Sequence, residues 1–334
     1  MARAAGVAIK TVSRALNNEP NVRQDTRERI LETVKRLNYH PSLSARGLAG
    51  RRSYLIGLIY ENPSANYLVD VQHGAMARCR EGRFQLLMHQ VSGRGEELER
   101  DVIGLIDQTG VDGLIVTAPL CQSNELIRTL DRREIPFVRM APNKMRHRTP
   151  YADMDDEGAA YEMTAYLIGL GHRRIGFISG HPEHFASGQR LNGYRKALKA
   201  HRIAYRASYV RQGFFIFESG LDAARQLLAM PEPPTAIFAS NDDMAAGVLM
   251  AAHEMGIAVP DQLSVAGFDD TYIARTVWPR LTTVHQPSYD LAYTAADLLL
   301  RVLSSQPAPK PVRLPYRLVC RASTGLTDDS DSHS

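Results

Sequence analysis

The stretches AGVAIKTVSRALNN (residues 5–18) and TRERILETVKRL (residues 26–37) decide the fold at the start of this chain. In the first stretch, Val12, Ala15 and Leu16 recur at the spacing of one helical face. The second stretch predicts another helix, near residues 26–38, with apolar positions at Ile30, Leu31, Val34 and Leu37. Gly6 stands just before the helix predicted from Ile9 to Asn18, where a tight turn between two helices often needs glycine. The spacing therefore predicts a small helical unit.

The polar face of the first of these helices carries Lys10, Arg14 and Asn17 at helical spacing. Two cations and one amide are the groups that suit guanine edges, adenine edges and phosphates. The alternative is an ordinary solvated face. The pattern is typical of a helix that reads nucleic acid.

The charge of the chain is concentrated at this end. Residues 1–52 contain eleven Lys or Arg and four Asp or Glu, a net charge of +7, whereas the whole chain has a net charge of +4. The rest of the chain is therefore slightly acidic. A basic head on such a body suits a polyanionic partner, because neutralising phosphates releases counterions.

The composition narrows the class of protein. A length of 334 residues predicts two or three structural units, and 44% hydrophobic with 23% charged residues is ordinary for a soluble globular protein. Cys79, Cys121 and Cys320 lie far apart, which fits a reducing cytoplasm rather than a disulfide framework or zinc site. His181 and His184 flank a proline loop without acidic or cysteine partners, so we expect no metal and no cofactor. No signal peptide or membrane span is predicted.

From Ser53 onward, strand-like apolar runs alternate with helical stretches. The expected strands are 54–60, 84–90, 112–118, 136–140, 151–154, 174–180, 235–240 and 263–269, and the expected helices are 71–81, 96–108, 161–169, 191–200, 221–230 and 243–255. This alternation predicts an α/β fold with parallel sheets covered on both faces. A break in the pattern near residues 153–158 predicts two lobes.

Polar side chains follow several of these strands. They are Asp155, Asn241, Asp242, Asp269 and Asp270, and Arg190 begins the helix RLNGYRKAL. Ligands of open α/β sheets bind beyond the carboxyl ends of the strands. Carboxylates, an amide and an arginine suit a polyhydroxylated ligand, since each hydroxyl both donates and accepts. The alternative for each Asp or Asn is a helix N-cap, which we expect to be the whole role of Asp156 and Asp242.

The motifs AGV-x-x-x-TVSRALN, TRERILE, NYHP and SARGLAG, followed by an LIGL strand, resemble the lac repressor (LacI) family, and the match continues in order through the whole chain. The resemblance implies an all-α helix-turn-helix head and a two-lobed periplasmic-binding-protein-like body of doubly wound sheets. It also implies that the helix after the turn enters the major groove of DNA.

Carried over position by position, the family motif implies a set of DNA contacts. Ile9, Lys10 and Arg14 are the expected base readers, Thr11, Ser13 and Asn17 the expected phosphate contacts, and Tyr39 belongs to the same set. Leu48 matches the hinge-helix leucine that wedges into the minor groove at the operator centre. A linker residue packed on the body is the alternative for Leu48.

The resemblance also implies an effector site in the cleft between the lobes. Its expected contacts are Tyr67, Asp155, Arg190, Phe215, Asn241 and Asp269. The aromatic faces would cover the apolar side of a sugar ring.

This sequence departs from the family pattern in three places. Ala8 and Arg23 stand where the family usually places capping serines, and losing such a cap costs about 1 kcal/mol. Gly47 lowers the helix propensity of the hinge, so we expect residues 43–50 to fold only on the operator. The first helix is short and uncapped, from which we expect the natural product to begin upstream of Met1.

The expected domains are a head at 1–41 with a truncated first helix, a hinge and linker at 42–52, an effector-binding and dimerisation domain at 53–327, and a disordered tail at 328–334. Lobe 1 is expected at about 53–154 and 286–311, and lobe 2 at about 155–285 and 312–327. The tail has no leucine heptads, so we expect a homodimer rather than a coiled-coil tetramer.

The prediction that follows is a cytoplasmic transcriptional regulator, most simply a repressor, whose operator affinity depends on a mono- or disaccharide. One alternative is a solute-binding protein of a sugar transport system, against which the basic head and the missing signal peptide both count. The other is an α/β enzyme acting on sugars. The sequence offers no nucleophile-and-base pair and no phosphate loop for such an enzyme.

Overall fold

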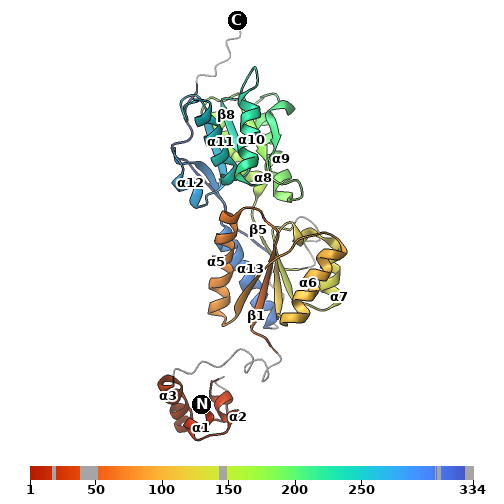
Figure 1. Cartoon of the computed structure of the whole chain (residues 1–334), viewed down its shortest axis with the longest axis vertical. Helices are drawn as coiled ribbons and strands as arrows, with labels where there is room; N and C mark the ends of the chain where they lie inside the picture. The colour runs from red at the N-terminus through yellow and green to blue at the C-terminus, as the bar shows by residue number, and fades with distance from the viewer. Residues whose placement is uncertain (17–19, 38–51, 143–148, 305, 307–309, 328–334) are drawn as a thin grey trace. The chain divides into compact units, whose positions relative to one another are not determined.

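The computed structural model describes residues 1–16, 20–37, 52–142, 149–304, 306 and 310–327 (Figure 1). The chain divides into two compact units, Met1–Tyr54 and Leu55–Ser334. The first unit is helical, and the second combines helices with two sheets. The predicted hinge helix and the acidic tail lie outside the described residues.

The first unit contains α1 (Ala2–Ala5), α2 (Ile9–Leu16) and α3 (Gln24–Arg36). Its core is formed by Ala5, Val12, Ala15 and Ile30, which are all at most 6% exposed. The predicted burial of Val12 and Ala15 is therefore confirmed. Leu31 and Leu37 are 42% and 47% exposed, so their predicted place on the packed face of α3 is wrong. Ile30 and Val34 suffice to cover so small a core.

The ends of these helices follow the local sequence. Gly6 ends α1 in the left-handed conformation with φ of 63°, which glycine adopts without strain. Arg23 precedes α3 and makes no side-chain capping hydrogen bond, as its replacement of a serine predicts. The last turn of α2 is linked to α3 by Arg27, whose Nη1 donates to the carbonyl of Ala15 at 3.1 Å.

The first sheet of the second unit has the order β11-β5-β4-β3-β1-β2. Its strands are β1 (Leu55–Tyr60), β2 (Gln85–Gln90), β3 (Gly113–Val116), β4 (Phe137–Met140), β5 (Tyr151–Asp153) and β11 (Val312–Arg313), and the helices packed with it are α5 (Ala65–Glu81), α6 (Glu96–Thr109), α7 (Asn124–Arg132) and α13 (Ser288–Leu303). Paired helices α5 and α13 form one layer, and α6 with α7 forms another (Figure 1). We call this part lobe 1.

The second sheet has the order β12-β10-β9-β8-β6-β7. Its strands are β6 (Ile175–Ser179), β7 (Val210–Gln212), β8 (Ala236–Ala239), β9 (Ser264–Asp269), β10 (Thr282–His285) and β12 (Arg317–Val319), and its helices are α8 (Asp156–Gly169), α9 (Phe185–Ala200), α10 (Phe217–Leu228), α11 (Asp242–Glu254) and α12 (Tyr272–Thr276). The pairs α8–α9 and α10–α11 are the main helix layers. We call this part lobe 2.

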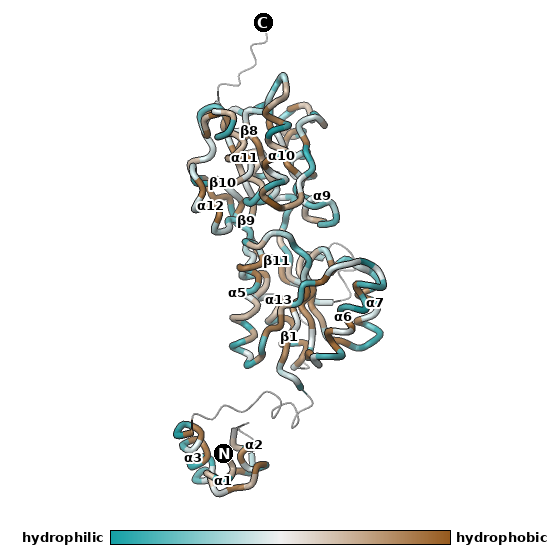
Figure 2. The backbone as a smooth tube through the Cα atoms, in the orientation of Figure 1, coloured by the Kyte–Doolittle hydropathy of each residue, from teal (hydrophilic) through white to brown (hydrophobic). Residues whose placement is uncertain are grey.

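The predicted α/β class is confirmed. All strand pairs are parallel except β10 with β12, and the middle strands of both sheets are buried along their whole length. Figure 2 shows the apolar strands inside and the polar residues on the outer helices. The eight predicted strands correspond to β1 to β6, β8 and β9. The elements α7, α12, α13, β7, β10, β11 and β12 lie in segments for which the apolar pattern predicted no separate element.

The chain crosses between the lobes three times. The crossings lie between β5 and α8, between β10 and α13, and between β11 and β12. Because Val312 and Arg313 pair with Ala152 and Asp153 of β5, lobe 1 extends two residues beyond the predicted limit at residue 311. Arg313 is fixed there by two hydrogen bonds to Asp153, at 3.0 and 3.1 Å.

Candidate functional site

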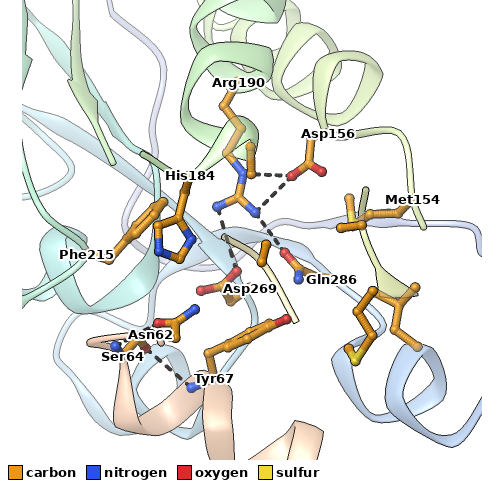
Figure 3. Close-up of a pocket in the computed structure, with 15 residues that line it drawn as sticks. Asn62, Ser64, Tyr67, Met154, Asp156, His184, Arg190, Phe215, Asp269 and Gln286 are labelled. Atoms are coloured by element: carbon orange, nitrogen blue, oxygen red, sulfur yellow. Dashed lines mark hydrogen bonds and ion pairs between the residues drawn. The ribbon is translucent and has the colours of Figure 1, made fainter. Parts of the chain in front are cut away.

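A pocket of about 60 Å³ lies between the two lobes (Figure 3). It is lined by Asn62, Ser64, Tyr67, Ala118, Met140, Ala141, Met154, Asp156, His184, Ala186, Arg190, Phe215, Asp269, Gln286 and Leu291. Many of these residues directly follow the carboxyl ends of parallel strands, which is where open α/β sheets bind ligands. Four of the six predicted effector contacts, Tyr67, Arg190, Phe215 and Asp269, are therefore brought together.

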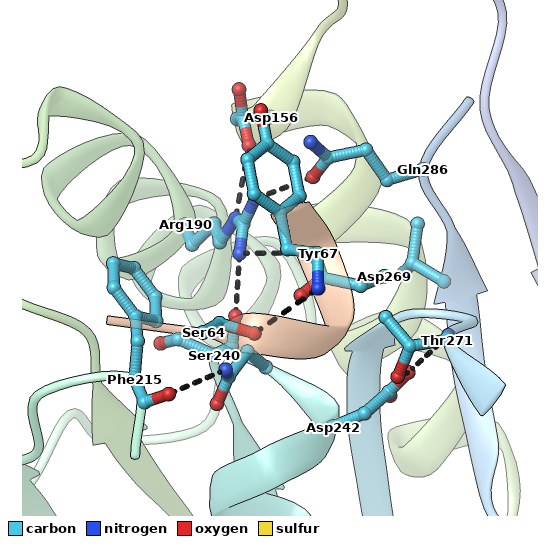
Figure 4. Close-up of polar contacts among 12 residues, drawn as sticks. Ser64, Tyr67, Asp156, Arg190, Phe215, Ser240, Asp242, Asp269, Thr271 and Gln286 are labelled. Carbon is cyan, nitrogen blue, oxygen red and sulfur yellow. Dashed lines mark hydrogen bonds and ion pairs between the residues drawn. The ribbon is translucent and has the colours of Figure 1, made fainter. Parts of the chain in front are cut away.

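Arg190 is the central cation of the pocket. It projects from α9 and is only 4% exposed. Its Nε donates to Asp156 at 2.9 Å, and its Nη2 donates to Gln286 Oε1 at 2.8 Å. The guanidinium carbon lies 3.5 Å from the ring centroid of Phe268, a cation–π contact. The polar partners, drawn in Figure 4, and the ring of Phe268 together fix the plane of the guanidinium.

The approach of α9 to α8 makes the pair between Arg190 and Asp156 possible. Gly193 of α9 faces α8, where a Cβ atom would come within 2.2 Å of the carbonyl oxygen of Glu157. A larger residue at this position would push the helices apart. Glycine therefore sets the spacing at which the arginine of one helix reaches the carboxylate at the start of the other.

Asp269 ends β9 and faces Arg190 across the pocket. Its Oδ1 lies 3.9 Å from Arg190 Nη1, the nearest cation among the described residues. Burial raises the pKa of Asp269 well above its usual range, and Arg190 offsets only part of this effect. Asp269 and Asp270 have φ of 114° and 60°, values that are strained for residues with a Cβ atom. Such strain is found at binding sites when the surrounding structure holds it.

The neighbouring Asp270 is the anchor of this strained turn. Its carboxylate accepts from His285 Nδ1 at 3.2 Å and forms ion pairs with Arg275, at 3.4 Å, and Arg321, at 2.5 Å. Burial raises the pKa of Asp270, but the hydrogen bonds from His285 and Arg321 outweigh it and lower the pKa to about 2. Asp270 therefore stays ionised and holds the turn that presents Asp269.

The structure reverses the predicted roles of Asp155 and Asp156. Asp155 is exposed and caps α8, since its Oδ1 accepts from the backbone N–H of Gly158 at 3.0 Å. Asp156, which we expected to serve only as a cap, lines the pocket and pairs with Arg190. The residue before a helix directs its side chain to the helix end, so the next residue is the one free to face the cleft.

Asn241 is also displaced from its predicted role. It is 1% exposed, caps α11 by accepting from Met244 N at 3.0 Å, and donates to the carbonyl of Phe215 at 3.0 Å. It does not line the pocket but fixes the backbone of a residue that does. Asp242 is not a cap, since its carboxylate accepts from Thr271 N at 2.8 Å and from Thr283 Oγ1 at 2.6 Å.

Aromatic side chains form part of the pocket wall. Phe215 has φ of 64° and packs against Gly180, where a Cβ atom would come within 2.0 Å of its ring. The ring of His184 meets Phe215 edge to face at 5.4 Å between centroids. Burial, followed by the nearby His181, lowers the pKa of His184 to about 4, so its imidazole is neutral at pH 7. Burial keeps Tyr67 as a neutral phenol by raising its pKa.

Sequence reasoning missed several residues of the pocket. Gln286 follows β10 and His184 follows β6, so both obey the strand-end rule that identified Asp269. Ser64 caps α5 by accepting from Tyr67 N at 3.3 Å, and this cap sits at the pocket edge. In the part of the chain that the structure describes, no group of three His, Cys, Asp or Glu residues is placed to hold a metal.

The predicted DNA-reading surface lies on α2 of the first unit. Ile9 is 79% exposed and Lys10 is also exposed, whereas Thr11, Ser13 and Arg14 are half-buried. Asn17, Tyr39 and Leu48 lie outside the described residues.

Comparisons with known proteins agree with this architecture. Residues 1–42 match the family described as "Bacterial regulatory proteins, lacI family", and residues 164–324 match "Periplasmic binding protein-like domain". Catabolite control protein A of Priestia megaterium is 33% identical over 326 residues, covering 97% of this chain and 98% of the relative. The HTH-type transcriptional repressor PurR of Escherichia coli is 34% identical over 326 residues, covering 97% and 95%.

Solved structures give the same result. The lac repressor dimer bound to operator and the anti-inducer ONPF has a TM-score of 0.83 and 30% identity, covering 97% of each chain. The complex of the transcriptional regulator CelR with cellobiose has a TM-score of 0.74 and 29% identity, covering 96% of this chain and 98% of the other. None of the helices within the described ranges combines the length and apolar character needed to cross a membrane. The chain belongs to the LacI family of bacterial regulatory proteins, and it is a DNA-binding transcriptional regulator.

Proposed function

We propose that this regulator is a repressor controlled by a small, uncharged, polyhydroxylated effector, most simply a mono- or disaccharide, bound in the pocket between the lobes. The observation that carries this proposal is the frame of Asp156, Arg190 and Gln286 at the pocket wall. The frame is rigid and largely neutralised within itself. A ligand whose hydroxyls both donate and accept hydrogen bonds therefore fits this frame better than a charged ligand does.

The remaining wall fits the same ligand. Among the described residues, none forms a hydrogen bond with the Tyr67 hydroxyl or the His184 ring, and both face the pocket. Asp269 offers a carboxyl group to neighbouring hydroxyls. Phe215, Met140 and Leu291 supply apolar surface for the less polar face of a sugar ring. The CelR relative with bound cellobiose supports a sugar in such a pocket.

The proposed DNA contacts remain those of the recognition helix. Ile9, Lys10 and Arg14 would meet base edges, while Thr11, Ser13 and Asn17 would contact phosphates. The exposure of Ile9 and Lys10 supports this assignment. Tyr39 and Leu48 complete the proposed set. We further propose a homodimer, since each head would read one half of a palindromic site, and the lac repressor relative is a dimer.

The proposed domains are a head at residues 1–41, a hinge and linker at 42–52, and an effector and dimerisation domain from residue 53. Effector binding and operator binding would then favour different arrangements of the lobes, which is allostery with two sites and two states. We propose that the protein acts in the cytoplasm, where its operator is accessible, and that it catalyses no reaction.

A thermal-shift screen of monosaccharides, disaccharides and nucleosides against the full chain tests the effector class. A true effector at a hundredfold excess over its dissociation constant should stabilise the protein by about 2.7 kcal/mol. Each compound that raises the Tm is then added to a fluorescence anisotropy titration with labelled operator DNA, selected from a random pool. Stabilisation by nucleosides alone would contradict the sugar proposal, and a Tm shift without any change in DNA affinity would contradict the regulatory one.

The DNA contacts need a separate measurement. The double variant K10A/R14A should weaken binding to the selected operator and flatten its dependence on salt concentration, because two cations are removed. The matched control is K196A/K199A, which removes two cations from α9 of lobe 2. Equal losses in both variants would show that charge alone, rather than α2, determines binding.

A further inference from the structure

The two lobes touch each other beyond the three crossover segments at a site outside the pocket frame. Arg94, which follows β2 in lobe 1, places its guanidinium between two carboxylates. Its Nη1 donates to Glu61 of lobe 1 at 2.8 Å. Its Nε donates to Glu183 of lobe 2 at 3.3 Å, and its Nη2 forms an ion pair with the same carboxylate. One cation thus joins the two lobes.

A second contact between the lobes lies next to the pocket. Asp243, in the first turn of α11, accepts from Ser64 Oγ at 2.5 Å and from Asn66 Nδ2 at 2.6 Å. Both donors belong to the start of α5 in lobe 1. Ser64 Oγ also accepts from Tyr67 N at 3.3 Å, so this contact and the pocket wall share one side chain. Asp243 is buried, whereas Arg94 and Glu183 are about half exposed, at 49% and 47% of their side chains.

Arg94 lies far from the crossover segments, so its contact is sensitive to the separation of the lobes. The three crossovers use β5, β10, β11 and β12, which lie at one end of the two sheets. Arg94 follows β2 at the opposite edge of the first sheet, and Glu183 follows β6, next to the opposite edge of the second sheet. A rotation that opens the lobes about the crossovers therefore separates Arg94 from Glu183 more than it separates atoms near the crossovers.

We propose that Arg94 is an electrostatic latch that sets the balance between closed and open lobes, with the Asp243 contact as its buried, salt-insensitive counterpart. This inference rests on the proposed function, since it names how the same pocket is regulated. Arg94 is not one of the residues that line the pocket, so it is a positioning residue for closure. Its hydrogen bonds hold the pKa of Glu183 below its usual range, so the pair stays ionised at neutral pH.

The exposure of the ion pair between Arg94 and Glu183 sets the size of the expected shift between closed and open lobes. An exposed ion pair shifts an equilibrium by about fivefold at most. Screening at high ionic strength should remove most of this bias, because the charges are in contact with water. The latch would thus make lobe closure, and through it the affinity for effector, depend moderately on salt.

The experiment measures the distance between the lobes in the full chain without effector or DNA. Spin labels are placed at R128C in lobe 1 and E218C in lobe 2, on a C320S background, because Cys79 and Cys121 are buried. Double electron–electron resonance is recorded with an excess of unlabelled protein, which suppresses distances between protomers. The variants are R94E, the charge swap R94E/E183R, and R133E as a matched control, since Arg133 pairs with Asp107 inside lobe 1.

R94E should shift the distance distribution toward the longer separation by about fivefold in population. R94E/E183R should restore it, because the arginine introduced in lobe 2 then faces two carboxylates of lobe 1. R133E should leave the distances unchanged, and 1 M NaCl should shift the distances of the parent protein in the same direction as R94E, because it screens the attraction.

Identical distributions in the parent, R94E and high-salt samples would overturn the latch, as would a swap that fails to restore the parent distances. Circular dichroism melting of each variant confirms that it is folded. N66A tests the buried contact and should open the lobes equally at low and high salt; a salt-dependent effect of N66A would contradict its assigned role. The distance measurement uses neither effector nor DNA, so a negative result contradicts the latch but not the proposed function. A negative thermal-shift screen contradicts the proposed effector but does not affect the measured distances.

Discussion

The two lobes have the same strand arrangement but bring different chemistry to the pocket. Lobe 2 supplies Asp156, His184, Arg190 and Asp269, which include every ionisable side chain of the lining except Tyr67. Lobe 1 supplies Tyr67 and a mainly apolar wall that includes Ala118, Met140 and Leu291. Equal topology therefore does not mean equal roles. The lobe with the charged frame fixes the orientation of a ligand, whereas the other covers it and excludes water.

The difference has a physical basis in how each group is held. Arg190, Asp156 and Gln286 satisfy one another before any ligand arrives, so the frame costs little to organise when a ligand binds. Tyr67 belongs to α5, whose start is also tied to lobe 2 through Ser64 and Asp243. The pocket wall from lobe 1, which carries Tyr67, is thus coupled to the separation of the lobes. The frame of Asp156, Arg190 and Gln286 is not.

R190M should have the largest effect. It removes the cation that neutralises Asp156 and Asp269, and breaking a buried ion pair by deleting one partner costs about 3–5 kcal/mol. We expect the free energy of unfolding, measured in urea, to fall by this amount. Compounds that stabilise the parent protein should not stabilise R190M. The double variant R190M/D156N should recover part of the stability without recovering binding. Retained effector binding in either variant would show that lobe 2 does not provide the frame.

D270N should have the next largest effect, and it depends on pH. The lowered pKa of Asp270 means that its ionised form stabilises the folded state above the unfolded pKa near 4, and that this stability is lost as pH falls toward about 2. The parent should therefore lose about 2 kcal/mol between pH 4 and pH 2 that D270N does not lose, and D270N should be less stable at pH 7. Chemical unfolding at several pH values measures the loss of stability at low pH and the difference in stability at pH 7. A parallel pH dependence in the two proteins would refute the role of Asp270 as anchor.

Y67F should have the smallest effect and should act only on binding. The hydroxyl of Tyr67 makes no hydrogen bond with any described residue, so its removal should change the free energy of unfolding by less than about 0.5 kcal/mol. Losing one hydrogen bond to a ligand should weaken effector affinity by about two- to tenfold. Isothermal titration with a compound from the screen measures this change. A loss as large as that of R190M would mean that the two lobes contribute equally.

The sequence predicted the elements of the two lobes well where they depend on local residue patterns. Continuous apolar runs such as 235–240 and 263–269 became buried parallel strands, because only a covered sheet accommodates them. The rule that ligands meet strand ends then located Asp269, and the family motif pointed to Arg190 on the neighbouring helix. Helix α13 was not predicted as a helix, although its residues fall in the segment 286–311 that was assigned to lobe 1.

The prediction failed where neighbouring residues compete for two roles. Asp155 and Asp156 are both carboxylates at one strand end, and their order in the sequence does not show which faces the cleft. Once α8 starts at Asp156, its N-cap is Asp155, and the side chain at the first helical position is free to meet Arg190. The same competition placed Asn241 on the end of α11.

The sequence by itself therefore determined the family, the helical head and the edge of the sheets at which a ligand would bind, because these depend on periodicity and residue type. Only the tertiary structure decided which side chains face one another across the lobes. The pairing of Arg94 with Glu183, and of Ser64 with Asp243, joins residues 89 and 179 positions apart. No local pattern encodes such pairs, since they form only when two sheets have folded and their ends are brought together.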